Sequence, residues 1–269
     1  MPEYGNTSYG IREADMVLTV QATPDSLQAQ IEAHESWLMG ESPAGRLDWR
    51  DETLPFSDLT GVNLSKSILS RSDLRSVILR GADMSDSNLY QAEFGPDLSG
   101  VNFERSQLMH ADLSHADLSD AIFVRANLFA ASLNGAYLDG ADFTEAVCIN
   151  EAKFAGADLS HANFHRTSIH DVSFRGARLI GADFAGARCF GVDFTKANLE
   201  HADLRECRFV NCSFSNTHLR GADLRNAVLD DSWLSYADLR NANTQGCRVI
   251  ESWGAGLNLA GLGDLLTFA

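Results

Sequence analysis

The chain has 269 residues, of which 45% are hydrophobic, so it can bury the core of one large domain or two small ones. Its formal net charge of −16 indicates a basic partner or mimicry of nucleic acid, and argues against direct binding of nucleic acid. No stretch approaches 18 consecutive apolar residues, and the opening MPEYGNTSYG lacks the basic start and apolar run of a signal peptide. We therefore expect no membrane span and a cytoplasmic location.

The segment 1–48 precedes any repeat, and residues 23–45 within it have the pattern of a short helix. Thr23 is a suitable N-cap and Pro24 a suitable first helical residue, while Gly40 is a plausible stop. The residues expected on one side of this helix are Leu27, Ile31, His34 and Leu38. Because the open end of a repeat array exposes unpaired backbone groups, we expect this helix to cap the array that follows.

A five-residue repeat fills residues 49–249. Between Ser106 and Phe143 every fifth residue is large and apolar, and the residue two before it is small. Asp or Asn usually stands between them, and the two residues that follow are mostly polar or Gly. This period of five fits neither a helix nor a flat strand, so it indicates a repeat architecture. Two one-residue shifts, near Gly95 and between Cys148 and Phe154, leave the register otherwise unbroken, which predicts one domain.

The segments GADMS, HADLS, GADLS, GADFA and KANLE resemble the bacterial pentapeptide-repeat family. This resemblance implies an all-β fold, a right-handed quadrilateral β-helix with one repeat per face and about 20 residues per coil. Packing agrees, because a square coil requires the small and the large residue of each repeat to point inward. Ten coils spaced by about 4.8 Å would form a rod on the order of 45 Å long.

No residues in the chain form a convincing catalytic, cofactor or metal site. The five cysteines occupy inward positions without a CxxC spacing, which is typical of small core residues in a reducing compartment. His34 lies on the predicted helix, and the other histidines fall at outward positions. No nucleotide-binding, hydrolase or zinc motif occurs, so we predict a protein that is not an enzyme and has no cofactor.

The acidic residues follow the repeat. About 13 of the 37 are the Asp just before the large inward residue, and without them 24 acidic residues would face 21 basic ones. Counting Leu59 as face one and stacking residues about 20 apart, faces one and two carry most of the charge, with Arg interleaved. The candidate acidic interaction face consists of Asp117, Asp120, Asp139, Asp142 and Asp158.

Face three differs, because the residue after its large inward position is mostly apolar. This apolar stripe consists of Tyr90, Met109, Phe129, Ile149, Phe190 and Val210, with His170 between Ile149 and Phe190. Exposed apolar patches usually mark an interface, with a second copy or a foreign protein. The alternative is a ladder of stacked side chains that only stabilises the face.

The segment 250–269 is rich in Leu and ends Leu-Leu-Thr-Phe-Ala, so we expect a short C-terminal cap or, alternatively, a dimerisation tail.

Two functions remain open. The resemblance implies a DNA mimic, because well-understood members bind type II topoisomerases, DNA gyrase or topoisomerase IV, and protect them from quinolones or other toxins. The external loops of plasmid-borne quinolone-resistance members are absent here, although loop-free members also bind gyrase. The alternative is a general protein-interaction scaffold or homodimer that uses the apolar stripe.

Overall fold

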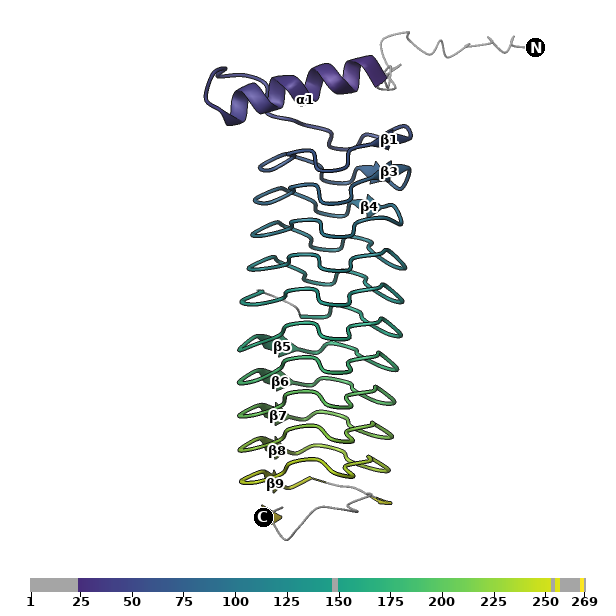
Figure 1. Ribbon diagram of the computed structural model, residues 1–269, viewed down its shortest axis with the longest axis vertical. Helices are drawn as coiled ribbons and strands as arrows, with labels where there is room; N and C mark the ends of the chain where they lie inside the picture. The colour runs from purple at the N-terminus through teal and green to yellow at the C-terminus, as the bar shows by residue number, and fades with distance from the viewer. Residues whose placement is uncertain (1–23, 147–149, 253–254, 257–266, 269) are drawn as a thin grey trace, which may run out of the picture.

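The computed structural model describes residues 24–146, 150–252, 255–256 and 267–268 of the chain. About ten coils stack into a rod, and one helix, α1 (Pro24–Leu38), lies across the first coil (Figure 1). The predicted β-helix with a helical N-terminal cap is confirmed. No helix in these residues is both long and apolar enough to cross a membrane.

Short parallel strands hold neighbouring coils together. Face one contains β1 (Ser57–Asp58) and β3 (Val77–Ile78), and face four contains β2 (Asp73–Leu74) and β4 (Glu93–Phe94). Face three of the later coils carries one parallel sheet, which β10 (Thr267–Phe268) extends by pairing with β9. Its other strands are β5 (Ser168–His170), β6 (Arg188–Phe190), β7 (Arg208–Val210), β8 (Val228–Asp230) and β9 (Arg248–Ile250).

The pairing register confirms both predicted shifts. Coils pair residues 20 apart, as in Asp183 with Asp203. After the first shift the pairs are 19 apart, as in Asp83 with Asn102, and across the second they are 21 apart, as in Ser132 with Lys153. Gly95 marks the first shift, since a Cβ there would lie 2.8 Å from the backbone oxygen of Arg75.

Two columns of phenylalanine fill the rod interior from opposite faces. On face two the rings of Phe143, Phe164 and Phe184 stack with centroids 4.7 Å apart, and all three are fully buried. Phe174 of face four meets Phe164 edge to face at 5.7 Å. Aromatic pairs favour both the stacked and the edge-to-face geometry. The rings therefore stabilise the rod along its axis, within each column, and across it, between the two columns.

The helix α1 closes the first coil with three of the four residues that the sequence predicted, and the fourth, Leu38, is half-buried. Leu27, Ile31 and His34 are buried against the array, and Gly40 beyond the helix has a φ of +76°. Thr23 lies outside the described residues, as does most of the predicted C-terminal cap, so neither prediction is tested.

Candidate interaction surfaces

The outward Asp of each repeat has a local structural task that does not need its charge. The backbone N–H of Ser119 donates to Asp117 Oδ1 at 3.0 Å, which closes an Asx turn before the corner of the coil. Asn performs the same task elsewhere, as where the N–H of Ser65 donates to Asn63 Oδ1 at 3.0 Å. The turn therefore needs a side-chain oxygen, and the choice of Asp over Asn adds charge to the surface.

In the last coils that charge is neutralised locally. The guanidinium of Arg225 pairs with Asp223 at 2.6 Å and holds the pKa of that carboxyl below its usual range. Arg240 does the same to Asp238, two residues before it, at 2.5 Å. These Asp residues add little net charge to their part of the rod.

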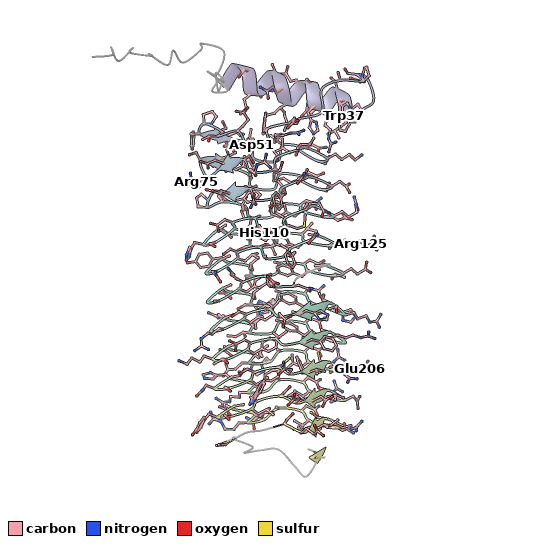
Figure 2. All side chains as sticks on the ribbon, turned by 180° about the vertical axis from the view of Figure 1, so that it is seen from behind. Trp37, Asp51, Arg75, His110, Arg125 and Glu206 are labelled. Carbon is pink, nitrogen blue, oxygen red and sulfur yellow. The ribbon has the colours of Figure 1, made fainter. Side chains whose placement is uncertain are left out.

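The middle of the rod differs. Residues 106–152, which we name the acidic section, contain seven acidic residues and a single Lys or Arg, Arg125. Arg125 projects from the rim of the coils, like Arg75 and Glu206 (Figure 2), and donates from Nε to Glu145 at 2.7 Å. In the rest of the repeat array, residues 49–105 and 153–249, 20 acidic residues face 18 basic ones. The net charge of the array is therefore concentrated in the acidic section.

The five residues of the candidate acidic face lie along faces one and two at this level. Within the described residues, Asp117, Asp120 and Asp142 have no ion pair. Asp139 lies 2.9 Å from His161 Nδ1, and Asp158, just beyond the acidic section, lies 3.9 Å from Arg178 Nε. Three of the five carboxylates, those of Asp117, Asp120 and Asp142, thus have no counter-charge among the described residues. Asp120 and Asp139 are exposed, and the other three are half-buried.

The apolar stripe on face three forms contacts along its own length. Tyr90, Met109, Phe129, Phe190 and Val210 are all half-buried, and Ile149 lies outside the described residues. His110, beside the stripe, meets Phe129 edge to face at 5.6 Å, while His170 stacks on Phe190 at 4.8 Å. Such ring contacts are typical of a ladder of stacked side chains. The described stripe residues are still partly exposed, so binding of a partner at this surface is a proposal.

Two of the large apolar residues that the structure exposes lie in the acidic section and were not predicted as surface features from the sequence. Ile122 and Tyr137 are 38% and 59% exposed. Both replace the outward Asp or Asn of their repeat, and both lie in the acidic section. The break in the repeat pattern at these two positions was the signal that could have found them.

Four of the five cysteines have the environment expected of core residues, and Cys148 lies outside the described residues. Cys189, Cys207, Cys212 and Cys247 are buried and free, and burial raises the pKa of the Cys212 thiol to about 11. Such thiols stay protonated and unreactive near neutral pH. In the described part of the chain, no three His, Cys, Asp or Glu side chains are grouped so that they could hold a metal ion.

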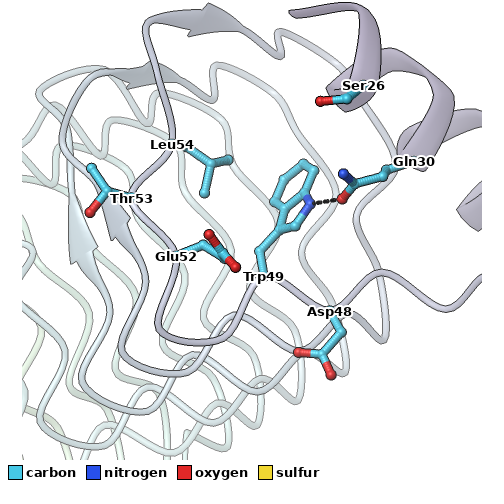
Figure 3. A pocket seen from close by; sticks show the side chains of 7 residues that line it. All are labelled: Ser26, Gln30, Asp48, Trp49, Glu52, Thr53 and Leu54. Atoms are coloured by element: carbon cyan, nitrogen blue, oxygen red, sulfur yellow. Dashed lines mark hydrogen bonds between the residues drawn. The ribbon is translucent and has the colours of Figure 1, made fainter. Parts of the chain in front are cut away.

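A pocket of about 290 Å³ lies between α1 and the first coil (Figure 3). Trp49 forms part of its wall, and its Nε1 donates to Gln30 Oε1 at 2.5 Å. Its acidic groups are Asp48, which is paired with Arg50, and Glu52. Its other polar lining residues are Ser26, Gln30 and Thr53.

The chain is similar to several solved structures and to one protein family. Among solved structures, the chain is similar to HetL, a pentapeptide repeat protein involved in heterocyst differentiation regulation from the cyanobacterium Nostoc, with 24% identity over 79% of this chain and 91% of that one and a TM-score of 0.37. It is also similar to QnrB1, a plasmid-mediated fluoroquinolone resistance protein, with 19% identity over 83% and 90% of the two chains and a TM-score of 0.32. No curated protein matches the chain.

The family described as Pentapeptide repeats matches in eight copies, over residues 57–94, 95–123, 121–150, 148–186, 173–209 and 207–246. These matches span more than two thirds of the chain. The chain therefore belongs to the pentapeptide-repeat family.

Proposed function

We propose that this protein is a non-enzymatic DNA mimic, whose acidic section binds the DNA-binding surface of a type II topoisomerase, DNA gyrase or topoisomerase IV, and modulates or protects that enzyme. Proteins of the family are in general structural or interaction proteins. The observation that carries the proposal is the concentration of negative charge in residues 106–152, which the turns of the fold do not require.

The density of that charge is close to that of DNA. The 47 residues of the acidic section, at 20 per coil and about 4.8 Å between coils, occupy about 11 Å of the rod axis. Seven carboxylates against one guanidinium leave six net negative charges, or one per roughly 2 Å of axis, where duplex DNA carries one per about 1.7 Å. A basic groove that binds DNA therefore meets a similar charge density on this part of the rod.

The test is a gyrase supercoiling assay with purified protein, combined with direct binding at increasing salt. We expect binding that weakens steeply with salt and is abolished when Asp117, Asp139 and Asp158 are all replaced by Lys. A control for the change of charge replaces Asp171, Glu206 and Asp231 by Lys at exposed corners away from the acidic section, and circular dichroism of both variants checks that the loss of the Asx turns at Asp117 and Asp158 leaves the fold intact. Gyrase that is unaffected by a high excess of the protein would reject the proposal.

A second candidate is self-association or partner binding through the apolar stripe, favoured by the half-exposed side chains of Phe129 and Phe190. Such binding would survive high salt and fail when both residues are replaced by Ser, with oligomeric state followed by light scattering. In either case the proposal assigns the protein to the cytoplasm, which cell fractionation tests.

A further inference from the structure

Tyr137 interrupts a column of outward Asp residues on face one. Parallel bridges place it directly between Asp117 of the preceding coil and Asp158 of the following one. Its side chain is 59% exposed, and no hydrogen bond of the described residues involves its hydroxyl. The Asx turn is also lost, since Tyr137 has no oxygen at the position where Asp117 accepts from Ser119. The fold does not explain this residue.

The surroundings of Tyr137 are acidic on three sides. Adjacent coils are about 4.8 Å apart, so the carboxylates of Asp117 and Asp158 flank the ring along the rod axis. Asp139 follows two residues later in the same coil and is exposed, and one of its carboxylate oxygens contacts His161 Nδ1 at 2.9 Å. On face one, the nearest Lys or Arg residues are Arg80, which is held by Asp97 at 2.6 Å, and Arg178, whose Nε lies 3.9 Å from Asp158.

This combination fits a guanidinium. The planar face of an arginine stacks on an aromatic ring, while its edge donates two hydrogen bonds to a carboxylate. A lysine ammonium is a compact and strongly hydrated charge that cannot form both contacts in the same way. A phosphate or nucleic acid would be repelled by the same carboxylates.

We propose that Tyr137, with the carboxylates of Asp117, Asp139 and Asp158, recognises an arginine side chain of a protein partner. The inference rests on the proposed binding function and adds the residue type that the partner must present. Tyr137 is then the aromatic anchor of the interface, and the acidic section around it supplies attraction at longer range.

The experiment compares nona-arginine with nona-lysine as probes, by calorimetric titration of the full chain. We expect nona-arginine to bind more tightly, and Tyr137→Ser to reduce the ratio of the two affinities by roughly two- to five-fold. Tyr137→Phe keeps an aromatic face and should keep the ratio. The matched control is Trp233→Ser, which removes another outward aromatic, 42% exposed, paired with uncharged Ser213, and should leave the ratio unchanged.

Equal affinities in the unsubstituted protein, or a ratio that survives Tyr137→Ser, would overturn the inference. Light scattering of the unsubstituted protein and of Tyr137→Ser provides one further outcome: self-association that disappears in the variant would make a second copy the occupant and reject a foreign partner. The titration contains no topoisomerase, so it tests the arginine preference independently of the proposed function. If the preference is observed but gyrase is unaffected by the protein, the topoisomerase is rejected as the partner and the arginine site is retained.

Discussion

At the scale of single residues, each repeat separates folding from surface chemistry. The small and large inward residues are almost fully buried along the array, while the outward Asp or Asn gives an oxygen to the next turn. The corner residue, second after the large one, has a positive φ, as at Gly221 with +69° and His201 with +58°. His201 lies over Gly221 of the next coil, where a Cβ would be 2.7 Å from its Nδ1. A large corner side chain that lies along the rod axis therefore requires a glycine at the corner of the next coil, as with His201 and Gly221.

Truncation of an inward phenylalanine should be strongly destabilising. Phe164→Ala removes a fully buried ring that stacks on two others at 4.7 Å, so we expect a loss of about 3–5 kcal/mol in the free energy of unfolding. Denaturant unfolding followed by circular dichroism measures this loss. Phe56→Ala is the control, because Phe56 is 74% exposed and should change stability by less than about 0.5 kcal/mol.

At the scale of elements, the cap helix is joined to the coils by one buried histidine. The N–H of Leu47 donates to His34 Nδ1 at 3.0 Å, and His34 Nε2 donates to the carbonyl of Ser65 at 2.9 Å. One ring thus connects α1, the segment after it and the first coils. Both bonds together require the neutral imidazole, because a proton on Nδ1 would face the N–H of Leu47.

The stability of the cap should therefore depend on pH. Burial lowers the pKa of His34 from its ordinary value near 6.5, and nearby Arg46 acts in the same direction. The unfolded chain then binds more protons than the folded one below that value, so stability is full above pH 6.5 and falls as the pH decreases. We expect a slope of up to about 1.4 kcal/mol per pH unit in unfolding measured between pH 7.5 and 5.5.

The variant His34→Gln removes the titrating group and should flatten that slope while lowering stability at pH 7.5. An unchanged slope in this variant would show that other groups cause the pH dependence. Asp residues that pair with Arg, such as Asp223, have lowered pKa values, and their contribution is lost only at more acidic pH.

At the scale of the whole molecule, the buried side chains repeat regularly along the rod, whereas the surface charge does not. The same coil repeats about ten times, yet the net charge of the array is concentrated in residues 106–152. The acidic section has one Arg among its seven acidic residues, whereas the last coils place an Arg two residues after an Asp. The position along the rod therefore decides what the surface can bind.

Removing charge from the middle of the rod should leave the fold intact. Asn at positions 117, 142 and 158 keeps the side-chain oxygen that accepts from the next turn, as Asn63 already does. We expect the triple variant Asp117→Asn, Asp142→Asn and Asp158→Asn to unfold within about 0.5 kcal/mol of the unsubstituted protein. Its binding of nona-arginine should be weaker and less dependent on salt. A loss of more than about 1 kcal/mol would mean that these charges serve the fold.

Much of the fold could be predicted from the sequence, because its information is local. Five-residue spacing identified the inward residues, the two register shifts and, with the pattern from Leu27 to His34, the capping helix. The candidate site was predictable only in part. Asp117 and Asp142 follow from the repeat, but Tyr137 departs from its consensus, and the exposure of its ring depends on the neighbouring side chains.

The five-residue period of the sequence determined which side chains of the described array are buried, because the small and the large residue of each repeat point inward. The resemblance to the family, which implies about 20 residues per coil, gave the number and register of the coils. Only the tertiary structure decided which outward groups meet. Asp139 faces His161, 22 residues away, while Asp120 has no charged partner among the described residues, and the apolar stripe is half-buried. Such contacts depend on side-chain rotamers, which the repeat pattern does not specify.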